Sequence, residues 1–215
     1  MKRAILLISV SLFVLSGCHK FGQKSGSGVM KIEKRTVASF TSVSVSGAYD
    51  VEIVVQKDQN VELEGDDNLL PLISTDVRGG VLEVSNSQSL STRNKLRLRI
   101  SVPSLEGISS SGASDIVISS VKSEGFGIDI SGAGSLRVSG ETKTLEMKLS
   151  GAGDVDAKDL HAQNVNVHSS GAATADVYAT AELRAAVSGA GNVNYYGDPK
   201  SVKEDISGAG TLTKR

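Results

Sequence analysis

The chain has 215 residues, of which 39% are hydrophobic and 4% aromatic, and its formal net charge is −1. That length suits one domain with a sizeable core or two small ones, and the apolar fraction is too high for a disordered chain despite 23 glycines. The near-neutral charge, with no basic or acidic tail, argues against nucleic acid as a partner.

The N-terminus predicts a secretion signal that ends at a lipidated cysteine. The positive "MKR" is followed by "AILLISVSLFVL", an apolar run too short to span a bilayer. The next motif, "LSGC" at 15–18, resembles the bacterial lipobox, in which cleavage leaves an acylated cysteine at the new N-terminus. We therefore expect residues 1–17 to be removed and Cys18 to anchor the protein in a membrane. The alternative is an ordinary signal peptide with an incidental thiol, which is unusual in an oxidising compartment.

The expected location is therefore the envelope of a Gram-negative bacterium, with the lipid of Cys18 in the outer membrane. The sequence leaves open whether the protein faces the periplasm or the exterior. Residues 18–29 are rich in Gly, Ser and Lys, so they predict a flexible tether.

Residues 30–105 predict a β-rich region of lower regularity. "FTSVSVSGAYDVEIVVQ" at 40–56 is a strand, a small-residue bend and a second strand. "DDNLLPLIS" at 66–74 predicts a short helical turn, and "VRGGVLEV" predicts a hairpin turn at 79–80. We expect this half to belong to the same sheet system as the rest of the chain and to cap one end of it.

The same bend recurs along the chain, most often as "SGAG". Serine precedes and alanine follows each of seven bend glycines, which are Gly47, Gly112, Gly132, Gly151, Gly171, Gly189 and Gly208. After a first gap of 65 residues the spacings are 20, 19, 20, 18 and 19. A period near 19 residues is typical of a solenoid.

The segments around each bend alternate apolar and polar residues, as in Phe126, Ile128 and Ile130, which indicates strands rather than helices. The sequence therefore predicts an all-β fold, a right-handed parallel β-solenoid with rungs of about 19 residues, regular over 106–215. Residues 30–215 then form one continuous domain. The glycines serve close backbone approach or a positive φ, and the alanines fit a tight interior corner. A phosphate-binding loop is excluded because no "GxxxxGK[ST]" occurs and no helix follows the bends.

Candidate catalytic or metal-binding groups are few. His19, His161 and His168 share no metal-ligand spacing, so neither a metal nor a cofactor is expected. Asp115 and Asp154 stand three residues after their bend glycines and two rungs apart, roughly 10 Å, near the upper limit for inverting glycosidases. However, the same column elsewhere holds Asp, Asn, Ser or Thr, which share the ability to bond turn backbone. We therefore assign no catalytic residue.

The strand–bend–strand unit at 40–56, the segment "GDDNLLPLI" and the serial "SGAGDV" bends together resemble the head-GIN domain family of putative autotransporter adhesins, over about 37–213. The resemblance implies a secreted or lipid-anchored β-solenoid, and it supplies no catalytic residues. The expected function is a non-enzymatic, lipid-anchored envelope protein that binds a glycan or a protein along one solenoid face. The alternatives are a polysaccharide hydrolase or lyase on a β-helix scaffold and a purely structural envelope protein.

Overall fold

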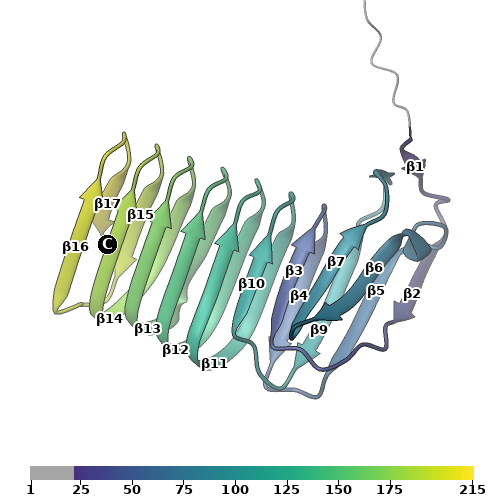
Figure 1. Ribbon diagram of the computed structural model, residues 1–215, viewed down its shortest axis with the longest axis horizontal. Coiled ribbons are helices and arrows are strands. Elements are labelled where there is room, and N and C mark those ends of the chain that lie inside the picture. The colour runs from purple at the N-terminus through teal and green to yellow at the C-terminus, as the bar shows by residue number, and fades with distance from the viewer. Residues whose placement is uncertain (1–21) are drawn as a thin grey trace, which may run out of the picture.

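The computed structural model describes residues 22–215, which fold into strands coiled as a β-solenoid, so the predicted fold class is confirmed (Figure 1). The predicted signal peptide and Cys18 lie outside the described residues. Within 22–215 no helix is long and apolar enough to cross a membrane. The elements are β1 (Lys24–Ser25), β2 (Met30–Lys34), β3 (Ser42–Ser46), β4 (Asp50–Val55), β5 (Asn60–Asp66), the 3₁₀-helix η1 (Leu70–Leu72), β6 (Ile73–Arg78), β7 (Val81–Asn86), β8 (Leu90–Ser91), β9 (Arg97–Val102), β10 (Gly107–Ser110), β11 (Asp115–Ile130), β12 (Ser135–Leu149), β13 (Asp154–Ser169), β14 (Thr174–Val187), β15 (Asn192–Tyr196), β16 (Ser201–Ile206) and β17 (Thr211–Lys214).

Each regular rung consists of a first strand, a four-residue bend and a second strand. The second strand then turns through what we call the second corner and becomes the first strand of the next rung. In β11 to β14 this corner lies inside one long strand, so each of these elements belongs to two rungs. Successive rungs pair in parallel, with Asp115 aligned on Ser135 and Ser135 aligned on Asp154.

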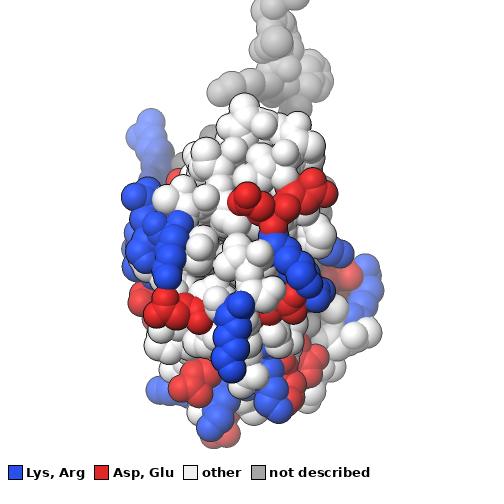
Figure 2. Space-filling model, turned by 90° about the vertical axis from the view of Figure 1, so that its left-hand side faces the viewer, with Lys and Arg blue, Asp and Glu red and all other residues white. Residues whose placement is uncertain are grey.

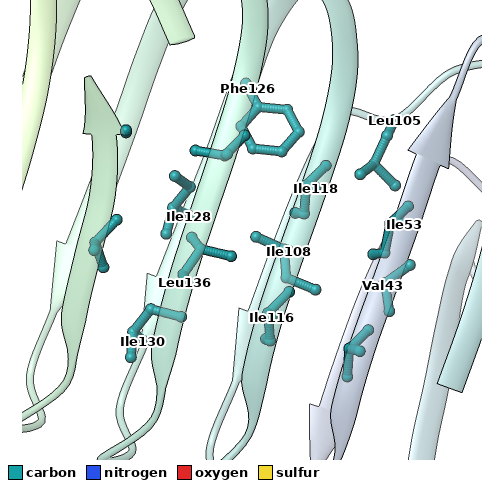
Figure 3. Close-up of a cluster of buried hydrophobic side chains, with 14 of the residues drawn as sticks. Val43, Ile53, Leu105, Ile108, Ile116, Ile118, Phe126, Ile128, Ile130 and Leu136 are labelled. Carbon is teal, nitrogen blue, oxygen red and sulfur yellow. The ribbon is translucent and has the colours of Figure 1, made fainter. Parts of the chain in front are cut away.

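The alternating side chains build the core as stacked columns. Val43, Ile108 and Ile128 are successive register partners in one column, and Ile116 and Leu136 are partners in another (Figure 3). All five are at most 3% exposed. Because residues of period two share one face of a strand, every rung adds the same buried positions to a continuous core.

The irregular half belongs to the same sheet system, as expected, but the chain visits its rungs out of sequence order. The bend at Gly47 stacks directly against the bend at Gly112, because the Ala113 N–H donates to the Gly47 carbonyl at 2.9 Å. The intervening residues stack on the other side of β3 and β4. There β7 and β9 continue the parallel pairing, and the antiparallel β5 and β6 follow as the cap. The predicted helical turn is η1, and the predicted hairpin joins β6 to β7.

The orientation of the bends corrects one prediction. The alanines that follow the bend glycines, such as Ala133 and Ala152, are exposed rather than interior. The inward position lies one residue later, where Ser114 and Ala173 are 1% and 3% exposed. The alternation of inward and outward side chains therefore continues from the last buried strand residue through the bend. As a result, the Ser before and the Ala after each bend glycine both point outward.

The tether prediction also needs correction for residues 24–29. β1 pairs with β8, and the Gly28 N–H donates to the carboxylate of Asp66 at 2.7 Å. In addition, the amide of Asn68 donates to the Ser25 carbonyl at 2.8 Å. A Gly/Ser-rich composition indicates flexibility only when the backbone has no partners, and here the cap supplies them.

A candidate binding groove at the second corner

The second corner is built by local irregularities in otherwise regular strands. Pairing of β11 with β12 shifts register between Ile118 and Val121, and similar shifts occur where β12 meets β13 and β13 meets β14. Ser120 and Gly140 have φ of 63° and 135°, which turns the chain sharply there. Such bulges bend a strand and redirect its side chains.

A groove of about 900 Å³ runs along this corner. Its lining comes from the loop before β10 and from β11, β12, β13 and β14, so it crosses four inter-strand steps, roughly 19 Å at about 4.8 Å per step. Most of the lining residues are of polar type. The residues are Ser104, Leu105, Glu106, Lys122, Ser123, Glu124, Gly125, Glu141, Thr142, Lys143, His161, Ala162, Gln163 and Thr180.

Exposed side chains flank the groove in two rows parallel to the solenoid axis. One row is formed by the register partners Lys122, Glu141 and His161. The other row contains Lys143, which forms an ion pair of 2.5 Å with Glu124. Both partners are well exposed, so this pair contributes little to stability. Its effect is to fix two opposite charges along the groove.

An aromatic ladder continues the first row toward the C-terminal end. His161, Tyr178 and Tyr196 are register partners on successive strands. The rings of His161 and Tyr178 stack with centroids 4.4 Å apart and an interplanar angle of 23°. Tyr195, by contrast, packs against the core, so the neighbouring tyrosines at 195 and 196 serve different purposes.

Charged side chains avoid the bends and gather elsewhere. In the end-on view the upper part of the molecule, where the bends lie, is almost free of Lys, Arg, Asp and Glu, whereas both signs mix over the lower half (Figure 2). The second corner lies on that lower side (Figure 1). The groove therefore opens on the charged and chemically varied side of the solenoid.

The carboxylate column considered from the sequence is present but lies away from this groove. Asp115 and Asp154 are exposed and are separated by Ser135, as their spacing predicts. The Ser135 hydroxyl donates to the Asp115 carboxylate at 2.7 Å, and Thr211 donates to Asn192 at 2.9 Å. These side chains therefore bridge neighbouring rungs, whereas we expected them to bond turn backbone. No group of three or more potential metal ligands occurs within residues 22–215.

An alignment of the repeats on their bend glycines does not reveal the groove residues. Lys122 and His161 each follow their bend glycine by ten residues, Glu141 follows by nine, and Tyr178 and Tyr196 follow by seven. Because the register shifts absorb these differences, the column is aligned in space but not in the sequence. The sequence feature that could have indicated the groove is the group of charged residues between the two strand segments at each second corner.

Comparison with known proteins agrees with the architecture. The family described as "Putative auto-transporter adhesin, head GIN domain" matches residues 39–199. No curated protein matches the chain.

Several solved structures share the fold. A putative adhesin from Bacteroides fragilis is 23% identical with a TM-score of 0.68, over 89% of this chain and 99% of that one. One from Parabacteroides merdae is 20% identical with a TM-score of 0.60, over 90% and 99%. One from Parabacteroides distasonis is 22% identical with a TM-score of 0.58, over 90% and 100%. Since the family match covers most of the residues, this chain belongs to the head GIN domain family of putative auto-transporter adhesins.

Proposed function

We propose that the protein is a non-enzymatic, lipid-anchored envelope protein that binds a surface ligand through the second-corner groove. The observation that carries the proposal is the placement of this groove. It lies at the opposite end of the rungs from β1, the most N-terminal strand of the described residues (Figure 1). A protein held by its N-terminus would therefore present the groove away from the anchored side.

The groove favours binding over glycan cleavage. Cleavage requires two carboxyl groups that converge on one bond, with one of them kept protonated by its surroundings. Of the groove glutamates, Glu124 is paired with Lys143, and Glu106 and Glu141 are exposed to solvent. Asp66, the one fully buried carboxylate within residues 22–215, lies in the N-terminal cap and not in the groove.

The anchor is tested by metabolic labelling of the full-length chain with a fatty acid. The "LSGC" motif predicts that wild type is labelled and that Cys18→Ala is not. Equal labelling of the two proteins would contradict lipidation at this residue.

Binding is tested with soluble residues 22–215 and a pair of matched variants. Gln163→Arg places bulk and charge in the groove, and Gln88→Arg makes the same change in an exposed loop between β7 and β8. We expect intact cells or extracellular matrix to retain wild type and Gln88→Arg but not Gln163→Arg. Equal retention of both variants would mean that the groove is not the binding site, and a lack of retention for all three would favour a structural role.

The enzymatic alternative is tested with the same soluble protein. We expect no new reducing ends or unsaturated products from envelope or host polysaccharides. Product formation that Glu141→Gln abolishes would overturn the non-enzymatic assignment.

A further inference from the structure

We infer that the ligand of the second-corner groove is a linear, uncharged polysaccharide that lies parallel to the solenoid axis. The inference rests on the proposed function, because it names the chemical class that this same groove recognises. It follows from the charge of the groove, from the hydrogen bonds that its backbone already makes, and from the spacing between its successive strands.

The charge of the groove excludes strongly charged polymers. Its lining contains three glutamates and two lysines, and opposite charges alternate along its length. Lys122 is aligned with Glu141, and Lys143 is paired with Glu124. A nucleic acid or polyanionic glycan needs a basic track, since neutralising its charges supplies much of the affinity. Such polymers would instead meet a carboxylate beside each lysine.

The state of the backbone excludes an extended peptide. A peptide that adds to a sheet needs a free strand edge. At this corner β11 pairs with β12, β12 with β13, and β13 with β14, through Lys122, Glu141, His161 and Tyr178. The backbone groups of these residues are therefore occupied, and the register shift between Ala162 and Asn164 is only a local gap, so the groove offers no continuous strand edge to a peptide.

The groove also lacks pockets for apolar anchors. Leu105 and Ala162, the apolar side chains of its lining, are at most 1% exposed. The apolar surface that the groove exposes therefore comes from carbon atoms of its other lining residues, and no large apolar side chain offers an anchor site for an amphipathic helix or a lipid chain. A ligand that suits this lining makes hydrogen bonds to carboxylate, ammonium, amide and hydroxyl groups and packs against the carbon atoms of the same side chains.

These groups suit the hydroxyls of a sugar chain. Glu141 offers acceptors, Lys122 offers donors, and the amide of Gln163 offers both. The ladder repeats every 4.8 Å or so, close to the length of one pyranose unit, so the roughly 19 Å groove accommodates about four units. A linear chain aligned with the axis meets equivalent positions on successive rungs, and His161, which stacks on Tyr178, lines the groove toward its C-terminal end.

The chain-length dependence of affinity tests this arrangement. Oligosaccharide ladders from cellulose, xylan, mannan and dextran are titrated against residues 22–215 by calorimetry. For at least one ladder we expect the dissociation constant to fall up to about four units and then level off. Glu141→Gln should weaken the longest oligomer about tenfold, because it removes a charged acceptor. Gln88→Arg should leave the affinity unchanged.

A cell-based experiment separates this inference from the proposed function. Mild periodate oxidises the vicinal diols of surface sugars, whereas protease removes surface proteins. Loss of retention after periodate, together with loss in Gln163→Arg, supports the polysaccharide. Retention that survives periodate but not protease keeps the binding function and overturns the inference. Retention by neither untreated nor treated cells, with no response to any oligosaccharide, overturns both.

Discussion

At the scale of the residue, the bend glycines are required by stacking and not by backbone conformation. Of the seven, only Gly47 has a positive φ, of 146°. A Cβ added to Gly151 would lie 1.8 Å from the carbonyl oxygen of Gly132, and one added to Gly171 would lie 2.0 Å from that of Gly151. Any side chain at these positions would force neighbouring rungs apart.

Gly151→Ala should therefore destabilise the protein by about 3 kcal/mol, the upper end of overpacking costs, because the methyl group meets backbone that cannot move aside. Ala152→Ser is the control, since Ala152 is exposed, and it should change the free energy of unfolding by at most about 0.5 kcal/mol. Denaturant unfolding of residues 22–215 measures both. Equal stability of the two variants would mean that the bends are not in close contact.

Ser169 is a polar residue in an apolar column. It is 3% exposed, its hydroxyl has no hydrogen-bond partner, and its register partners are Leu149 and Val187. A buried polar group without a partner costs free energy. We expect Ser169→Ala to leave stability unchanged or to raise it by up to about 1 kcal/mol, as measured by thermal unfolding. A clear loss of stability would show that the hydroxyl has a partner in solution.

At the scale of the element, Asp66 at the end of β5 fixes the N-terminal segment to the cap. It accepts hydrogen bonds from Thr92, from the Gly28 N–H at 2.7 Å and from Asn94 at 3.0 Å. The bond from Thr92 lowers the pKa of Asp66 most, burial opposes this shift, and the bonds from Gly28 and Asn94 reinforce it. The folded state thus favours the ionised carboxylate.

A carboxylate whose pKa is lower in the folded state than in the unfolded state stabilises the fold at pH values above its unfolded pKa, which is 3.8 for Asp66. This contribution is lost as the pH falls through the pKa of the folded state. We therefore expect Asp66→Asn to be less stable than wild type at pH 7, with the difference shrinking below pH 3.8. Denaturant midpoints at pH 7 and pH 3 provide the comparison. A difference that does not depend on pH would contradict the role of the charge.

The elements that could be predicted from the sequence are those with a local pattern. Phe126, Ile128 and Ile130 alternate within one strand, so their burial follows from period two alone. The antiparallel cap depends on the chain returning to the far side of β3, and no local pattern encodes that return. The groove escaped prediction because Tyr178 and His161 align only after register shifts inside the strands.

At the scale of the whole molecule, both ends of the solenoid carry charges at inward positions of their edge strands. At the C-terminal end Glu204 is aligned with Ala185, and Lys214 is aligned with Tyr195. At the other end Glu33 on β2 is aligned with the buried Leu63. Inward charges on edge strands prevent another sheet from stacking there, a common protection against aggregation.

The double variant Glu204→Val and Lys214→Val should therefore associate. It would extend two apolar columns to an exposed edge, so head-to-head contacts between copies become favourable. Sedimentation of residues 22–215 should show larger species for the double variant than for wild type at the same concentration. The matched control is Glu83→Val with Lys95→Val, at outward positions. Identical behaviour of the two double variants would mean that the ends are not protected by these charges.

The central claim is that the bends, strands and second corners form one rigid ladder, which presents the groove without further ordering. Hydrogen exchange at the amides of Ala133, Ala152 and Ala172 tests this claim directly. Each donates to the glycine carbonyl of the preceding bend at 3.0 to 3.1 Å, although the alanine side chains are exposed. We predict that these amides exchange as slowly as those of the flanking strands. Exchange at the rate of an open loop would contradict the stacked ladder.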